Sequence, residues 1–417
     1  MLDRTSAPAF SKTFTFELPK PEVVRLSGGV DLVFLSGVPQ DVFKLDVIFE
    51  AGKWWESKRG VAHFTSVTLD KGTTTRSAKE IAEHFDYYGS QIEVSPGYDF
   101  VSVSLYGLTK HFDKVFPVFC EVISEPIFPQ EEFELQQQIF VENLKVNNEK
   151  NSFVASKVLR KNVFGDSHPY GGSVESQDAL GLTKEDLSNY FQQHFKPSEI
   201  YLTGNFNQKQ LQTVVDKFIA PKPSGGNKEF TPVSSSVDEV ITKEESVQSS
   251  LRLGKKIINR THPDYFELLV LNHILGGYFG SRLMKNIREE KGLTYGIYSS
   301  VNPFRNDCLF SIGADVGKEK KDLALMEIKR ELSKLIEQPI GLDELAAAKN
   351  HFLGSLQLEV ANPFASIDKI KNIRLNDLGD SFYKNLFSKV QASNSNSLQS
   401  LAAKYFSLDE LLMVCVG

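Results

Sequence analysis

Residues 268–300 carry the clearest pattern of apolar and polar positions in the chain. The pattern begins as an apolar helix, breaks at Gly276-Gly277 and restarts with Ser281 as the predicted N-cap of a second, amphipathic helix. Gly292 predicts the end of that helix, and residues 293–300 have the aromatic and β-branched content of a strand. The stretch therefore predicts a helix, a glycine break, a second helix and a strand.

In the first half of the chain, apolar positions change between the period of a strand and that of a helix. The turn Ser27-Gly28-Gly29 predicts a hairpin between strands 22–26 and 30–35. Further strands are predicted at 43–51, 91–94, 100–106 and 200–203, and helices at 60–69, 77–88, 112–123, 130–148, 152–163, 183–194 and 208–219.

A stretch rich in Pro, Gly and Ser at 221–240 has no clear period and predicts a linker. We accordingly predict domains at 1–222 and 241–417, with a linker over 223–240. After the linker the element order is repeated, which suggests an internal duplication. The predicted fold is α+β, with two homologous domains, each a mixed or antiparallel sheet packed on one side by helices. Strands are predicted at 247–253, 295–301, 308–314 and 411–416, and helices at 318–336, 342–358, 363–376, 380–387 and 395–405.

Composition limits the class of protein without identifying its function. A chain of 417 residues with 41% apolar and 24% charged residues is typical of a globular protein with at least two domains. A net charge of −6 argues against nucleic acid or an anionic membrane as the main partner. The three cysteines lack CxxC spacing and predict buried free thiols in a reducing compartment. Without a signal-peptide or membrane-spanning pattern, we expect a cytoplasmic protein, or a periplasmic one if a leader was removed.

Two side chains in the opening stretch are candidates for ligand binding. Arg288 lies near the end of the predicted second helix, and Tyr295 begins the strand that follows seven residues later. A guanidinium and a phenol beside a glycine-rich turn could hold a carbonyl or carboxylate without a metal. From spacing alone, a surface arginine and a half-buried tyrosine without a functional role are the favoured interpretation.

The motifs of this stretch resemble those of the pitrilysin/insulinase-type zinc peptidases, a family that includes the mitochondrial processing peptidase and bacterial two-subunit forms. The resemblance implies that Arg288 and Tyr295 bind the substrate peptide near its scissile bond. The matched positions are Leu275-Gly276-Gly277, Ser281-Arg282-Leu283, Arg288, Gly292-Leu293 and Tyr295.

In that family the first half carries the inverted zinc motif H-x-x-E-H on a helix. Two histidines four residues apart share one helical face and bind Zn²⁺, the glutamate between them activates a metal-bound water, and a later glutamate completes the site. The surrounding frame of that motif is present in this chain, as Gly60-Val61-Ala62-His63-Phe64, Lys71-Gly72-Thr73 and Arg76.

The metal-binding residues that the resemblance implies are mostly replaced. His63 is kept, but Ser66 stands at the general base, Val67 at the second histidine and Asn143 at the third ligand, and a one-residue slip would place Glu142 there instead. Valine has no donor atom, and neutral asparagine supplies no anionic oxygen. We therefore expect no metal and no cofactor in this chain. Two neighbouring departures are Gln136, at the position of a supporting glutamate, and Glu93-Val94, where active members have asparagine-alanine on the peptide-pairing strand.

Three hypotheses about function remain. In the first, the chain is the non-catalytic, substrate-binding subunit of a heteromeric zinc endopeptidase that acts on peptides or unfolded segments. Its partner would be a homologous, zinc-bearing subunit, and the chain could form a homodimer in isolation. In the second, it is a structural or scaffolding homologue without a role in proteolysis. In the third, it is an enzyme with an unrecognised site, although neither a phosphate-binding loop nor a nucleophile elbow occurs.

Overall fold

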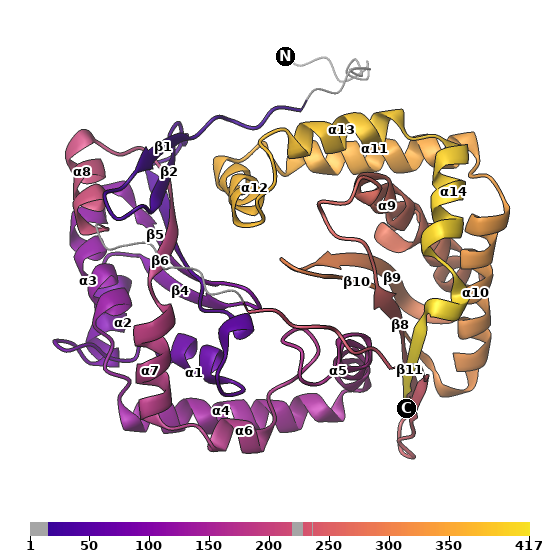
Figure 1. The fold of residues 1–417 in the computed structure, drawn as a ribbon, viewed down its shortest axis with the longest axis horizontal. Helices are drawn as coiled ribbons and strands as arrows, with labels where there is room; N and C mark the ends of the chain where they lie inside the picture. Colours follow the sequence, from indigo (N-terminus) through magenta and orange to yellow (C-terminus); the bar gives the residue numbers. More distant parts are fainter. Residues whose placement is uncertain (1–15, 219–227, 236) are drawn as a thin grey trace, which may run out of the picture.

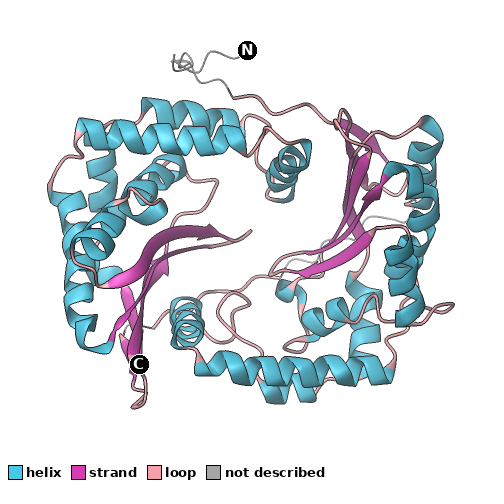
Figure 2. Ribbon diagram, turned by 180° about the vertical axis from the view of Figure 1, so that it is seen from behind, coloured by secondary structure: helices cyan, strands magenta, loops and turns pink. Residues whose placement is uncertain are grey.

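The computed structural model describes residues 16–218, 228–235 and 237–417. Two halves face each other, with a β-sheet on the facing side of each half and most helices on the outside (Figures 1 and 2). This arrangement confirms the predicted α+β class with two mixed sheets. Within the described residues, no helix has the length and apolar character needed to cross a bilayer.

The first half contains a six-stranded sheet in the order β1-β2-β6-β3-β5-β4, in which β2 and β6 are parallel and all other neighbours are antiparallel. Strand β4 lies at one edge. The strands are β1 (Glu22–Arg25), β2 (Asp31–Leu35), β3 (Val42–Phe49), β4 (Gln91–Pro96), β5 (Val101–Leu108) and β6 (Pro197–Thr203). The helices are α1 (Val61–Val67), α2 (Ala78–Tyr87), α3 (Phe112–Ser124), α4 (Gln130–Glu149), α5 (Asn151–Phe164), α6 (Ser176–Leu180), α7 (Lys184–His194) and α8 (Gln208–Lys217).

The second half contains a five-stranded sheet in the order β7-β11-β8-β10-β9, with one parallel pair, β7 and β11. Strand β9 lies at one edge. The strands are β7 (Glu239–Ile241), β8 (Gln248–Lys256), β9 (Thr294–Pro303), β10 (Cys308–Gly317) and β11 (Leu412–Val416). The helices are α9 (Tyr265–Asn272), the π-helices η3 (His273–Gly277) and η4 (Met284–Glu290), α10 (Lys321–Glu337), α11 (Leu342–Leu358), α12 (Pro363–Leu375), α13 (Phe382–Ala392) and α14 (Ser395–Tyr405).

Most predicted elements are present with shifted ends. The hairpin formed by β1 and β2 turns through Gly29, whose φ of +86° favours glycine. Strand β7 begins inside the predicted linker 223–240. Residues 223–227 and 236 of that linker, and residue 219 of the predicted helix 208–219, lie outside the described residues. The domain boundaries themselves stay a prediction.

The two halves each place one helix on the sheet of the other half. Helix α5, from the first half, buries its apolar face on the second sheet, whereas α12, from the second half, packs on the first sheet (Figure 1). The sequence predicted helices on one side of each sheet only, because the pattern of a helix does not show which sheet it covers. The buried α5 contacts are Ala155, Leu159 and Val163 with Leu309, Val414 and Val416; those of α12 are Ile367 and Ile370 with Val33, Leu35, Ile48 and Tyr201.

Ion pairs reinforce the contact between α12 and the first sheet. Asp46 on β3 is 1% exposed and accepts hydrogen bonds from Lys371 at 2.8 Å and from Ser104 at 2.6 Å. Lys44 lies 3.2 Å from the same carboxylate. One turn further along α12, Arg374 binds Glu199 of β6 at 2.9 Å. A carboxylate this deeply buried is tolerated because two cations and a hydroxyl surround it.

We predict that Asp46→Ala lowers the free energy of unfolding by about 3 kcal/mol, because the buried Lys44 and the half-buried Lys371 then keep only the exposed carboxylate of Asp368 as a partner. Asp368→Ala is the matched control. Asp368 contacts the same two lysines, but its side chain is 49% exposed, so about 1 kcal/mol or less is expected. Urea denaturation measures both. Equal losses for the two variants would show that α12 is not anchored through Asp46.

Candidate functional site

The glycine break in residues 268–300 forms where the chain approaches strand β9. Helix α9 widens into the π-helix η3, and Gly276 leaves helical geometry at a φ of −158° and a ψ of 15°. A Cβ atom at Gly276 would lie 2.5 Å from the backbone nitrogen of Ser299 on β9. Glycine is required here because any side chain would collide with strand backbone. The predicted break is confirmed, but the π geometry was not predicted.

The two ends of the second helix in this stretch agree with the predicted caps to different degrees. Ser281 accepts a hydrogen bond from the Lys285 amide through its carbonyl, but its buried hydroxyl has no partner within the described residues. Ser281 therefore occupies the predicted N-cap position, directly before the helical residues that begin at 282, but its side chain does not cap the helix. At the other end Gly292 has a φ of +59°, and the Leu293 amide donates to the Ile287 carbonyl at 3.0 Å. This left-handed C-terminal turn confirms the predicted cap.

Arg288 and Tyr295 come together, although not through the phenol. Arg288 Nε donates to the backbone carbonyl of Tyr295 at 2.9 Å, and its guanidinium carbon lies 4.8 Å from the centroid of the Phe279 ring. The Tyr295 side chain is 94% exposed. Within the described part of the chain, Nε makes the only hydrogen bond of this guanidinium, so its two terminal nitrogens can still donate to a ligand.

This arginine lies beside an unpaired sheet edge. Strand β9 hydrogen-bonds to β10 on one side and to no described strand on the other. Two further aromatic side chains near this edge, Phe279 and Tyr298, are 60% and 50% exposed. An open edge with exposed aromatic rings and a free guanidinium can accept an extended peptide as an added strand.

In the first half, His63 packs among aromatic rings on α1. Its ring centroid lies 5.3 Å from that of Phe140 on α4, and burial lowers the pKa of His63. Ser66 donates to the Ala62 carbonyl at 2.7 Å and is fully buried. Val67 packs against the hydrophobic core. The three positions of the inverted motif therefore hold one imidazole, one internally bonded hydroxyl and one hydrocarbon.

Helix α4 presents no anionic ligand to this place. Phe140 contacts His63, and Gln136 and Asn143 lie one turn before and after it on the same helix. Asn143 is exposed, as is Glu142, which binds Lys145 at 3.2 Å instead. Structural and catalytic zinc sites use three or four Cys, His, Asp or Glu ligands. The donor set does not fit zinc, and no described group of three such residues is arranged for a metal.

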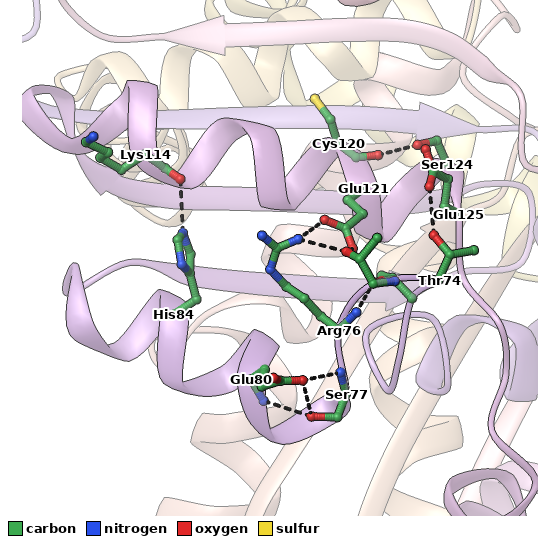
Figure 3. A network of polar contacts seen from close by, with 12 residues as sticks. Thr74, Arg76, Ser77, Glu80, His84, Lys114, Cys120, Glu121, Ser124 and Glu125 are labelled. Atoms are coloured by element: carbon green, nitrogen blue, oxygen red, sulfur yellow. Dashed lines mark hydrogen bonds and ion pairs between the residues drawn. The ribbon is translucent and has the colours of Figure 1, made fainter.

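The loop that follows α1 is tied to α3 by polar contacts (Figure 3). Glu121 on α3 binds Thr73, Thr75 and Arg76, and Thr74 donates to Glu125 at 2.9 Å. Although burial raises the pKa of Glu121, the hydroxyl hydrogen bonds and the charge of Arg76 lower it overall. The Lys-Gly-Thr frame of the former zinc motif thus has a structural role that does not depend on a metal.

Glu56 caps the N-terminus of α1, and its titration makes the stability of the fold depend on pH. It accepts hydrogen bonds from the Gly60 and Ala62 amides at 3.0 and 3.1 Å. Burial raises the pKa of Glu56 to about 7, against the opposing effects of these hydrogen bonds and of Lys53. The folded state therefore binds a proton more tightly than the unfolded state, in which the pKa is about 4.5.

We predict that stability falls as the pH rises from about 4.5 to about 7, because the folded chain must lose a proton that the unfolded chain has already lost. One pKa unit corresponds to about 1.4 kcal/mol, so Glu56 contributes about 1–3 kcal/mol to this change. Glu56→Gln keeps a hydrogen-bond acceptor and removes the titration. Thermal unfolding of both proteins across this range measures the difference, and parallel curves would contradict the assignment to Glu56.

The sequence missed one pair of histidines. His273 on η3 and His351 on α11 are 78 positions apart, yet their Nε2 and Nδ1 atoms lie 3.1 Å apart. No short sequence motif indicates this pair, because the two histidines are far apart in the chain. The only available signal was the predicted duplication, which makes the two helices neighbours.

Comparisons with known proteins agree with these observations. The sequence model of the insulinase family (peptidase family M16) matches residues 33–174, and that of the peptidase M16 inactive domain matches residues 181–352. YmxG of Bacillus subtilis, an uncharacterized zinc protease, is 25% identical over 361 residues, 85% of this chain and 87% of the relative.

Solved structures show the same fold. A peptidase M16 inactive domain from Pseudomonas fluorescens has a TM-score of 0.87 at 24% identity and covers 96% of this chain and 98% of its own. A chain in the structure of Complex III2 from Candida albicans has a TM-score of 0.76 at 15% identity and covers 95% of both chains.

Proposed function

Because the chain belongs to the insulinase-type peptidase family M16, we propose that it is the non-catalytic, substrate-binding subunit of a heteromeric zinc endopeptidase. The observation that carries the proposal is an asymmetry between the halves. The metal-binding positions of the first half are replaced by Ser66, Val67 and Asn143, whereas Arg288 in the second half lies beside an open strand edge with its terminal nitrogens available.

In this proposal a homologous, zinc-bearing subunit supplies the metal and the general base. A peptide or unfolded segment lies along β9 as an added strand, and its backbone pairs with the free edge. The guanidinium of Arg288 donates to the substrate carbonyl and more strongly to the oxyanion that develops there. The phenol of Tyr295, which is 94% exposed, donates to the same substrate from the strand itself.

One observation favours a second candidate, a scaffolding role. The Complex III2 chain from Candida albicans has the same fold, so a structure of this kind also occurs within a larger assembly. Scaffolding does not require the side chains of Arg288 and Tyr295 to be available for a ligand, and this distinction can be tested.

With the zinc-bearing partner, Arg288→Ala should reduce kcat/KM for an unstructured peptide by roughly tenfold or more, because one oxyanion donor is lost. Tyr295→Phe, which removes only the hydroxyl, should also reduce it. Lys285→Ala is the matched control, since Lys285 is an exposed cation on the same helix. Full activity of both site variants would favour the scaffolding role.

We also predict that the isolated chain binds no zinc that depends on His63 and does not cleave the peptide. A single imidazole without a second protein ligand forms a weak site. Metal analysis of the wild-type chain and of His63→Gln tests this. Zinc that is present in the wild type and lost in the variant, together with turnover, would overturn the proposed division of labour.

A further inference from the structure

The second half contains an imidazole pair at the counterpart of the degenerate zinc motif. In the first half, strand β3 is followed by the helices α1 and α2, the strands β4 and β5, and then α3 and α4. In the second half, β8 is followed by α9 with η3, then η4, the strands β9 and β10, and then α10 and α11. By this order α1 corresponds to α9 and η3, and α4 corresponds to α11.

The side-chain contacts follow the same correspondence. Helices α1 and α4 bring the rings of His63 and Phe140 to a centroid distance of 5.3 Å. Helices η3 and α11 bring the rings of His273 and His351 to 5.0 Å. In the second half, therefore, both helices contribute an imidazole at the contact, where the first half has one imidazole and one phenyl ring.

The distance between the ring nitrogens is suited to a shared metal ion. His273 Nε2 and His351 Nδ1 are 3.1 Å apart. Two nitrogens bound to one tetrahedral ion at ~2.0–2.1 Å lie about 3.3–3.4 Å from each other. An ion could bind both nitrogens after the proton between them is displaced and the rings turn, so that both lone pairs point at the ion.

The surroundings hold both rings in position and favour the neutral form of His273. Tyr278 stacks on His273 with a centroid distance of 4.5 Å and an interplanar angle of 8°, and its ring lies 4.7 Å from that of His351. Burial, with a smaller effect of His351, lowers the pKa of His273 to about 4. A metal binds the neutral imidazole, so this ring does not have to lose a proton at neutral pH.

A cavity of about 600 Å³ borders the pair and leaves room for further ligands. Both histidines line it, together with Asn372 of α12 and Glu359, which follows α11. Since no third His, Cys, Asp or Glu in the described residues joins the pair, the remaining coordination positions belong to water or to a small ligand in the cavity.

We propose that His273 and His351 form a binding site for Cu²⁺, the divalent first-row ion that nitrogen ligands bind most tightly. The site has two protein ligands and open positions toward the cavity. It does not depend on the proposed role in proteolysis, because none of its residues belongs to the β9 edge or to the inverted motif.

Cu²⁺ is the most sensitive probe, since it binds nitrogen sites most tightly among the divalent first-row ions. The untagged full-length chain is titrated with Cu²⁺ against a competing chelator, and the bound ion is examined by electron paramagnetic resonance. We expect one ion per chain with hyperfine coupling to two imidazole nitrogens. His351→Gln should weaken binding by about tenfold or more, since even the loss of supporting partners costs this much, and should leave coupling to one nitrogen.

His63→Gln and His262→Gln are the controls, and both should bind as the wild type does. His351 is exposed, so its variant should fold normally, and circular dichroism checks this; His273→Gln provides an independent second variant. Binding that is absent in the wild type, or that is unchanged by both His273→Gln and His351→Gln, would overturn the proposal. Loss of the ion in His63→Gln in place of His351→Gln would move the site to the first half and equally overturn it.

Discussion

The reciprocal exchange of α5 and α12 is the contact on which the rest of the structure depends. Each sheet has its own helices on one face and a helix of the other half on the opposite face, so the central strands of both sheets are buried on both sides. The buried carboxylate of Asp46 and its contact with Lys371 add a polar contact that only one position of α12 satisfies. The relative position of the two halves is consequently fixed by core packing.

This packing keeps the degenerate motif of the first half apart from the proposed peptide-binding edge of the second half. Replacing metal ligands by Ser66 and Val67 on α1 removes charge and donor atoms, but both residues pack well within the first half. The strand edge of β9 belongs to a separate hydrophobic core in the second half. Because the two features rest on different cores, the loss of one does not disturb the other. The duplicated architecture also accounts for the histidine pair, which lies at the counterpart of the inverted motif.

The sequence predicted the elements well because their periodicity is local, and residues 268–300 show both the success and its limit. Gly276 predicted a break and Gly292 a cap, since backbone geometry demands glycine at both places. The hydroxyl of Ser281 and the π-helical turns were not predictable, because they depend on packing against β9 and on an extra residue per turn. The packing of α12 on the first sheet could not be predicted for the same reason, because a local pattern of apolar residues does not indicate long-range contacts.

For the candidate functional residues, the sequence predicted chemical identity better than spatial arrangement. The replacement of the metal ligands is readable from the chain alone, because valine cannot bind a metal in any conformation. The proximity of Arg288 and Tyr295 also followed from their spacing, but the contact uses the tyrosine carbonyl and leaves the phenol in solvent. The approach of His273 to His351 could not be found in this way, since it joins two helices far apart in the sequence.

The central claim is that the free edge of β9 holds the substrate backbone, and amide hydrogen exchange tests it most directly. The chain is combined with a zinc-bearing partner that is inactivated at its general base, and a saturating unstructured peptide is added. We predict that amides of β9 that do not bond to β10 become protected when the peptide is added, and that this protection is weaker in Arg288→Ala. Protection of β4 alone, or of neither edge strand, would contradict this account.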